Sequence, residues 1–388
     1  MARAPLGTTT RRSGDQPLRE ARRARWIGPG LDALNVVEWA RYASDVLVLM
    51  PAAALLPLRW GLALAHALGV VEALSPLRAA RSTRAEVAAL GVRGRWRQFQ
   101  ATAARLAFPR KDFFYLARFA RGRDELADWR IEEVGGESLH RMLAEGRSVV
   151  LATGHFSLAG STLRRVVLPR RSMSLVGEPV PWQLSPFRLR LRLATGVRVR
   201  ARARALRTLP PAVGASPRQY VPDMWTRGRD PDAQPARSPH IQETMLAHLA
   251  EPGALLVVAV DAVWPKPGAL RHPFAGRAEQ QFAVGGARVA RLAQCPVVPY
   301  VITLGGAPRT VRVEFGPAIE PALPDDEAAD ARLTRQLLEW IEVQVGRYPE
   351  QYLALIGVER RWDAAAERWV GASSETQAAA VISADAAS

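Results

Sequence analysis

The sequence contains very little lysine and a single cysteine. Lys111 and Lys266 are the only lysines among 53 basic residues, and all the others are arginine. Because Cys295 is alone, one chain can form neither an internal disulfide framework nor a multi-cysteine metal site. The six histidines also lack metal-ligand spacing, so we expect no metal and no other cofactor.

Long apolar runs are missing as well. Two segments, Val46–Leu58 and Gly61–Val71, are mostly apolar, but Arg59 separates them. Neither segment reaches the roughly 20 residues that span a bilayer. Residues 1–25 are basic and polar, which does not fit a secretory signal peptide. We therefore interpret residues 31–78 as a membrane-associated helical segment, interfacial or re-entrant. The alternative is a buried helical hairpin of a soluble domain.

Acidic residues are too few to balance the arginines, and the formal net charge is +16. Such a charge attracts nucleic acid, anionic lipid headgroups or phosphorylated substrates, although GC-rich coding also produces arginine without selection for binding. No zinc-finger, helix-turn-helix or stacked-aromatic motif accompanies the charge, so we expect no nucleic-acid partner. In a strand, Arg198, Arg200, Arg202 and Arg204 would share one face, suited to phosphate or an acidic carrier protein, or simply solvated.

The sequence pattern after the N-terminal segments is typical of an α/β domain. Short apolar runs alternate with helical stretches such as Pro239–Ala250 and Val284–Ala293, which predicts a mostly parallel central sheet covered by helices. Residues 79–147 are expected to be mainly helical, and Arg95–Phe108 and Lys111–Arg121 show helical spacing. The predicted organisation is a disordered basic arm at 1–30, the membrane-associated segment at 31–78, the α/β domain at 79–365 and a disordered tail at 366–388.

His155 is the first candidate for chemistry. It follows the apolar run Ser148–Ala152 and a glycine, where a strand is expected to lead into a helix. The carboxyl edge of an open α/β sheet is the usual ligand crevice, and backbone N–H groups at a helix start favour a phosphate or an oxyanion. His155 is therefore a candidate general base. A histidine in such a place is otherwise a structural hydrogen-bonding residue.

Four later blocks occur in an ordered set. They are Arg271–Arg277, Phe282–Ala293, Cys295–Pro299 and Tyr348–Tyr352, the last followed by Arg361 and Trp362. Together with the His155 turn, this set resembles the late acyltransferases of lipid A biosynthesis, within the lysophospholipid acyltransferase superfamily. The resemblance covers roughly Val46 to Trp362.

The resemblance implies acyl transfer at the cytoplasmic face of the cell inner membrane, without a metal. The donor would be an acyl carrier protein or coenzyme A thioester, and the acceptor a hydroxyl of a lipid or glycolipid. His155 occupies the place of the family's catalytic histidine. Arg164 and Arg277 are candidates to stabilise negative charge, and Phe274 and Gly276 belong to the same predicted substrate-binding block.

One departure stands out, because the family pairs its histidine with an acid five positions later and this chain has Gly160 there. Glu178, after the run Ser174–Val176, is one candidate for a relocated acid, and Asp261, after the run Leu255–Val260, is another. If neither lies near His155, the chain is expected to be a weakly active or non-catalytic lipid- or partner-binding relative. An acceptor other than lipid A, such as a pigment, an ornithine lipid or a glycolipid, is a further alternative.

Overall fold

A computed structural model provides the structure of the protein. It describes residues 36–75, 78–124, 128–157, 172–175, 197, 200–201, 219–220, 239–263 and 268–371. The predicted basic arm at 1–30 lies outside these residues, as do Gly160, Arg164 and Glu178.

The chain has an α/β fold with a mostly parallel mixed sheet, which confirms the predicted fold class. Within the described residues the sheet has seven strands, and only the β8–β9 pair is antiparallel. In spatial order the strands are β1 (Arg130–Val134), β9 (Thr310–Phe315), β8 (Val297–Leu304), β2 (Val149–Thr153), β5 (Leu255–Ala259), β3 (Ser172–Leu175) and β4 (Gln219–Tyr220).

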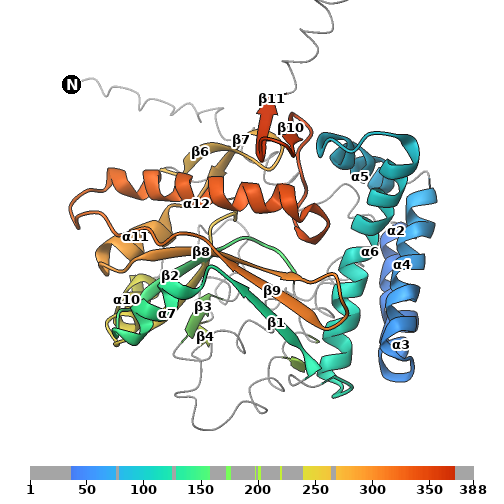
Figure 1. The fold of residues 1–388 in the computed structure, drawn as a ribbon, viewed down its shortest axis with the longest axis horizontal. Coiled ribbons are helices and arrows are strands. Elements are labelled where there is room, and N and C mark those ends of the chain that lie inside the picture. Colours follow the sequence, from blue (N-terminus) through green and yellow to red (C-terminus); the bar gives the residue numbers. More distant parts are fainter. Residues whose placement is uncertain are drawn as a thin grey trace, which may run out of the picture.

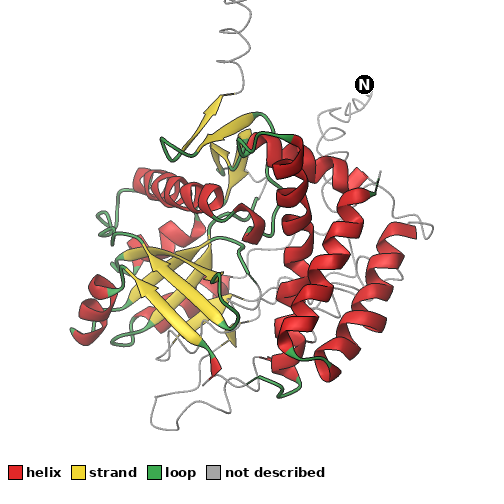
Figure 2. Ribbon diagram, turned by 45° about the vertical axis from the view of Figure 1, so that its right-hand side comes forward, coloured by secondary structure: helices red, strands yellow, loops and turns green. Residues whose placement is uncertain are grey.

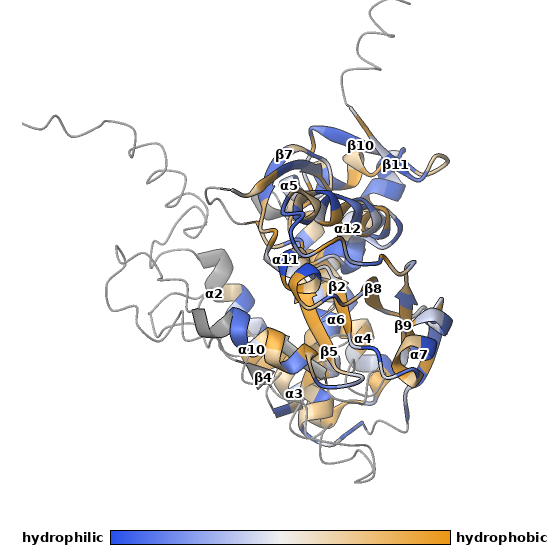
Figure 3. Cartoon of the chain, turned by 90° about the vertical axis from the view of Figure 1, so that its left-hand side faces the viewer, coloured by the Kyte–Doolittle hydropathy of each residue, from blue (hydrophilic) through white to orange (hydrophobic). Residues whose placement is uncertain are grey.

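The central strands read as continuous apolar runs because both faces of the sheet are covered. Along β2, Val149 and Leu151 join one core cluster, whereas Val150 and Ala152 join the cluster on the other face. In Figure 3 the strands β2 and β5 are coloured mainly as hydrophobic. The helices α10 (Pro239–Leu249), α11 (Gly285–Leu292) and α12 (Ala328–Arg347) cover one face, and α7 (Glu137–Ala144) covers the other together with part of the N-terminal helices.

The N-terminal helices form a layer beside the sheet, on the right of Figures 1 and 2. The carboxylate of Glu72 is buried and binds the guanidinium groups of both Arg41 and Arg110, which ties three of these helices together. The layer contains α2 (Val36–Ala43), the π-helix η2 (Ser44–Leu49), α3 (Met50–Leu55), α4 (Leu58–Leu74), α5 (Arg78–Ala89) and α6 (Arg95–Ala120).

No helix among the described residues is both long enough and apolar enough to span a bilayer. The membrane association of residues 31–78 therefore stays a prediction.

Residues 79–147 are mainly helical, as predicted, and three local details add to the sequence analysis. The two helical stretches before and after Pro109 are one helix, α6, which continues through the proline. β1 lies within the range expected to be helical; it is an edge strand whose charged sequence carries little strand pattern. Val197, Arg200 and Ala201 are helical instead of extended, because the spacing of 197 and 201 puts both apolar side chains on one buried face.

Two antiparallel hairpins close the far end of the domain, at the top of Figure 1. They are β6 (Leu270–Phe274) with β7 (Arg277–Phe282), and β10 (Arg360–Asp363) with β11 (Arg368–Gly371). β11 extends into the range predicted to be a disordered tail from residue 366. It is ordered because the indole of Trp369 is buried against Trp362, at 5.6 Å between ring centroids.

Close approach of α4 and α6 depends on Gly69. A Cβ atom there would lie 2.5 Å from Ala107 Cβ and 2.7 Å from Ala103 O. We predict that Gly69→Val lowers the free energy of unfolding by about 1–3 kcal/mol, since overpacking forces the helices apart. Ala67→Val, on the exposed face of the same helix, is the control and should change stability little. Urea unfolding checks both; equal stability of the two variants would contradict the close packing.

Candidate active site

Two neighbouring parallel strands bring His155 and Asp261 to the same edge of the sheet. His155 comes two residues after β2, and Asp261 comes two residues after β5. The strands remain paired beyond their ends, because Val260 N donates to Thr153 O at 2.9 Å. Crossover connections make neighbouring strands run in the same direction, so their carboxyl ends meet at one edge of the sheet. Residues 106 positions apart in sequence therefore become neighbours.

The Asp261 carboxylate holds His155 at two points. One oxygen, Oδ1, lies 2.7 Å from His155 Nδ1, and the other, Oδ2, accepts a 2.7 Å bond from His155 N. The side chain of Asp261 is fully buried, whereas that of His155 is 54% exposed. The carboxylate therefore fixes the ring through Nδ1 and leaves proton acceptance to Nε2, the arrangement that a histidine general base needs.

The carboxylate that contacts His155 comes from the loop that follows β5. Of the two candidates, Asp261 lies within hydrogen-bond distance of His155, and Glu178 is outside the described residues. Gly154 permits this approach, because a Cβ atom there would lie 3.0 Å from Ile341 and 3.3 Å from Asp261 Oδ2.

The loop that carries His155 is anchored on both sides. Ser157 Oγ donates to Asp112 Oδ1 of α6 at 2.5 Å, and both side chains are buried. On the other side, Leu353 N donates to His155 O at 2.8 Å. The helical layer and the C-terminal part of the chain therefore both determine where the imidazole lies.

Tyr352 is a site residue that the sequence reasoning did not single out. Its hydroxyl is hydrogen-bonded to Asp261, and its ring packs against Phe156 at 5.4 Å between centroids. Burial, and then the charge of Asp261, raise the pKa of Tyr352 well above its usual value, so the phenol keeps its proton and donates. The available signal was its place in the block Tyr348–Tyr352, which was used only for the resemblance.

Three of the predicted substrate-binding residues lie at the turn between β6 and β7, and they differ in burial and in contacts. Phe274 is 2% exposed and packs against Phe282 and Tyr352, so its side chain belongs to the core behind the site. Gly276 has a φ of 80°, and its carbonyl accepts bonds from Glu359 N and Arg360 N. Both residues thus shape the turn, and neither side chain presents a polar group to a ligand.

Of these three residues, Arg277 is the one whose side chain can bind a ligand through a charged group. Its charge opposes the rise in the pKa of Tyr352 that burial and Asp261 cause. Among the described residues it has no salt-bridge partner, and its buried Nε has no hydrogen-bond partner. A guanidinium whose Nε lacks a partner among the described residues is a candidate to bind a phosphate or an oxyanion.

A buried acid supports the turn from behind. Glu342 Oε1 of α12 accepts a 2.8 Å bond from Ala275 N and a 2.6 Å bond from Arg360 Nη1. Burial raises the pKa of Glu342 to about 7 despite the opposing charge of Arg360. The position of the turn therefore depends on a carboxyl group that titrates close to neutrality.

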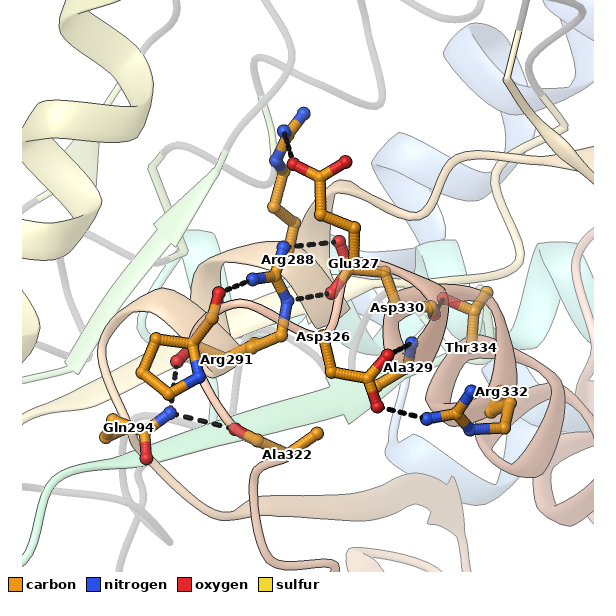
Figure 4. Close-up of polar contacts among 11 residues, drawn as sticks. Arg288, Arg291, Gln294, Ala322, Asp326, Glu327, Ala329, Asp330, Arg332 and Thr334 are labelled. Carbon is orange, nitrogen blue, oxygen red and sulfur yellow. Dashed lines mark hydrogen bonds and ion pairs between the residues drawn. The ribbon is translucent and has the colours of Figure 1, made fainter.

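A second polar cluster lies at the opposite edge of the sheet, where α11 ends and α12 begins (Figure 4). It borders a cavity of about 190 Å³ near the start of β8. Asp330 binds Arg291 through both oxygens, at 2.8 and 3.1 Å, and Glu327 binds Arg288. Because carboxylates already neutralise these arginines, the cluster serves to join the two helices and has no free charge for a substrate.

No protein-family model matches the chain, and no curated protein matches its sequence. Within the described residues, no group of three or more His, Cys, Asp or Glu side chains is placed to hold a metal ion.

Glu342 gives the stability a predictable pH dependence. Its folded-state pKa of about 7 exceeds its ordinary value of 4.5, so the stability that Glu342 contributes is present below pH 4.5 and is lost as pH rises through 7. We expect wild type to lose about 3 kcal/mol relative to Glu342→Gln between pH 4.5 and 8, measured by urea unfolding.

Glu320→Gln is the matched control, since Glu320 pairs with Arg147 on the surface and is 63% exposed. Its unfolding curve should follow wild type at each pH. Parallel pH curves for Glu342→Gln and wild type would contradict the raised pKa.

Proposed function

We propose that the protein is a membrane-associated acyltransferase. It moves a fatty acyl group from an acyl carrier protein or coenzyme A thioester to a hydroxyl of a lipid, glycolipid or related acceptor. The observation that carries the proposal is the contact between the buried Asp261 carboxylate and Nδ1 of the exposed His155 imidazole. This is the geometry of a general base that takes a proton from an alcohol.

In the proposed reaction, His155 Nε2 accepts the hydroxyl proton while the acceptor oxygen attacks the thioester carbonyl carbon. The resulting imidazolium is stabilised by Asp261. As the carbon–sulfur bond breaks, the imidazolium returns the proton to the leaving thiolate, so the products are an ester and a free thiol. Because the acceptor attacks directly, no covalent acyl-enzyme forms.

Arg277 supports the choice of a negatively charged substrate or transition state. Its charge acts on the pKa of Tyr352, and its buried Nε has no hydrogen-bond partner within the described part of the chain. We assign it to the developing oxyanion or to a phosphate of the donor or acceptor.

The outer face of α4 supports a lipid surface as the place of action. Trp60, Ala63, Ala67, Val71 and Leu74 are all exposed and recur every three or four residues, so they form one apolar stripe along the helix. Trp60, Val71 and Leu74 are 59%, 66% and 68% exposed. The exposed Arg59 stands beside the stripe and suits anionic headgroups.

The non-catalytic alternative was motivated by Gly160, which left the histidine without an acid. Asp261 removes that motive, because it supplies a buried carboxylate at 2.7 Å from the ring. We therefore favour the enzyme.

Removal of either member of the pair should slow turnover strongly. We expect His155→Ala and Asp261→Asn each to lower the rate of acyl transfer by about 10²–10⁴-fold, since the base or its orienting charge is lost. Mass spectrometry of acyl transfer from acyl carrier protein and coenzyme A thioesters to lysolipid and glycolipid acceptors gives the rates.

His140→Ala is the control for the loss of a histidine, because His140 is exposed on α7 and pairs with Glu133. It should keep the wild-type rate. Wild-type turnover by His155→Ala would refute the proposal.

The stripe predicts binding to lipid surfaces. Val71→Glu should reduce co-flotation with anionic phospholipid vesicles by about tenfold, since a charge in an apolar contact must be desolvated. Leu323→Glu is the control, because Leu323 is 71% exposed in the loop before α12 and outside the helical layer. Equal flotation of the two variants would exclude this face as the membrane contact.

A further inference from the structure

The segment 349–354, which we call the strap, crosses the carboxyl edge of the sheet beside His155. Gln351 fastens it to the end of β8, because its side chain accepts from Leu304 N at 2.6 Å and donates to Leu304 O at 2.9 Å. A glutamine thus makes the pair of bonds that a neighbouring strand would make.

Arg105 of α6 fastens the strap from the other side. Its guanidinium donates to the carbonyl oxygens of Pro349, Tyr352 at 3.3 Å and Ala354 at 3.1 Å. The same group pairs with the buried carboxylate of Glu86 at 2.7 Å. Three carbonyl oxygens on one cation leave the strap little freedom.

The strap delivers one polar group to the site, the hydroxyl of Tyr352. Its ring is fixed between Phe156 and Phe274, at 5.4 and 6.2 Å between centroids. Together with His155 N and His155 Nδ1, the hydroxyl completes a set of three donors around the fully buried Asp261 carboxylate.

We infer that Tyr352 is a positioning residue for the proposed acyl transfer, which acts through Asp261 to set how strongly His155 holds a proton. The inference rests on the proposed function for its effect on rate, but its effect on the imidazole is independent of any substrate. The charged groups that face the phenol are Asp261, Arg105 and Arg277. The two arginines are unaltered in the variant below, so only the donor to the carboxylate changes.

The test variant is Tyr352→Phe, which keeps the ring packing and deletes the donor. The carboxylate then places more of its charge on the imidazolium, so His155 stays protonated to higher pH. The midpoint for diethylpyrocarbonate labelling of the His155 peptide, followed by mass spectrometry, should rise by about half a pH unit. Acyl transfer should fall by up to about threefold below the midpoint and recover at high pH, because half a pH unit changes the fraction of neutral imidazole by no more than that.

A second variant keeps the hydroxyl and should shift the labelling midpoint in the opposite direction. Fluorotyrosine introduced at position 352 is a stronger donor, so it should lower the labelling midpoint of His155. This variant decides the question if Tyr352→Phe does not fold. Tyr348→Phe is the matched control, since Tyr348 precedes the strap and its hydroxyl meets Glu314 at 3.4 Å; it should leave midpoint and rate unchanged.

An unchanged or lowered midpoint in Tyr352→Phe, or a rate lowered equally at every pH, overturns the inference, because a purely structural tyrosine would do the latter. A raised midpoint in a protein that shows no acyl transfer would support the positioning role and refute the proposed function. The two failures are therefore distinguishable.

Discussion

A carboxylate that is fully removed from water has to keep every donor that stabilises its charge, and Asp261 is such a group. Its partners are the backbone and ring nitrogens of His155 and the hydroxyl of Tyr352. Loss of any one leaves a buried charge undersatisfied. The requirement therefore fixes the end of β2, the end of β5 and the strap relative to one another. It also fixes the imidazole of His155, which faces solvent.

The surrounding structure fulfils that requirement from three directions. The parallel pairing of β2 and β5 continues to Val260 and sets the distance between the two loops. α6 holds the His155 loop through Asp112 and the strap through Arg105. α12 supports the neighbouring turn through Glu342. The N-terminal helices are thus part of the site's scaffold, and the exposed apolar stripe of α4 belongs to the same layer.

The sequence predicted the parts of this arrangement that have a short-range pattern. The continuous apolar runs of β2, β5 and β8 predicted a buried, mostly parallel sheet, and the position of His155 after such a run predicted a residue at its carboxyl edge. Asp261 was one of two candidate acids for the same reason, since it also follows an apolar run. The choice between candidates needed the strand order, which depends on pairing between distant segments.

The remaining differences have equally local causes. α6 continues through Pro109, where a sequence pattern favours a break, because its buried face packs along α4 on both sides of the proline, at Gly69 before it and at Gly61 after it. β1 is a charged edge strand with no apolar alternation to reveal it. Tyr352 was missed because nothing in a Pro-Glu-Gln-Tyr segment indicates that its hydroxyl meets an aspartate 91 positions earlier, a contact that exists only once Gln351 and Arg105 fix the strap.

The central claim is that Asp261 holds the His155 ring by Nδ1 and so directs Nε2 toward a substrate. The nitrogen-15 chemical shifts of the neutral His155 imidazole test this most directly and need no substrate. The account predicts a proton on Nδ1 and none on Nε2, with this preference lost in Asp261→Asn. A proton on Nε2 in the wild-type protein would contradict the account, because the exposed nitrogen would then have no lone pair with which to accept a proton.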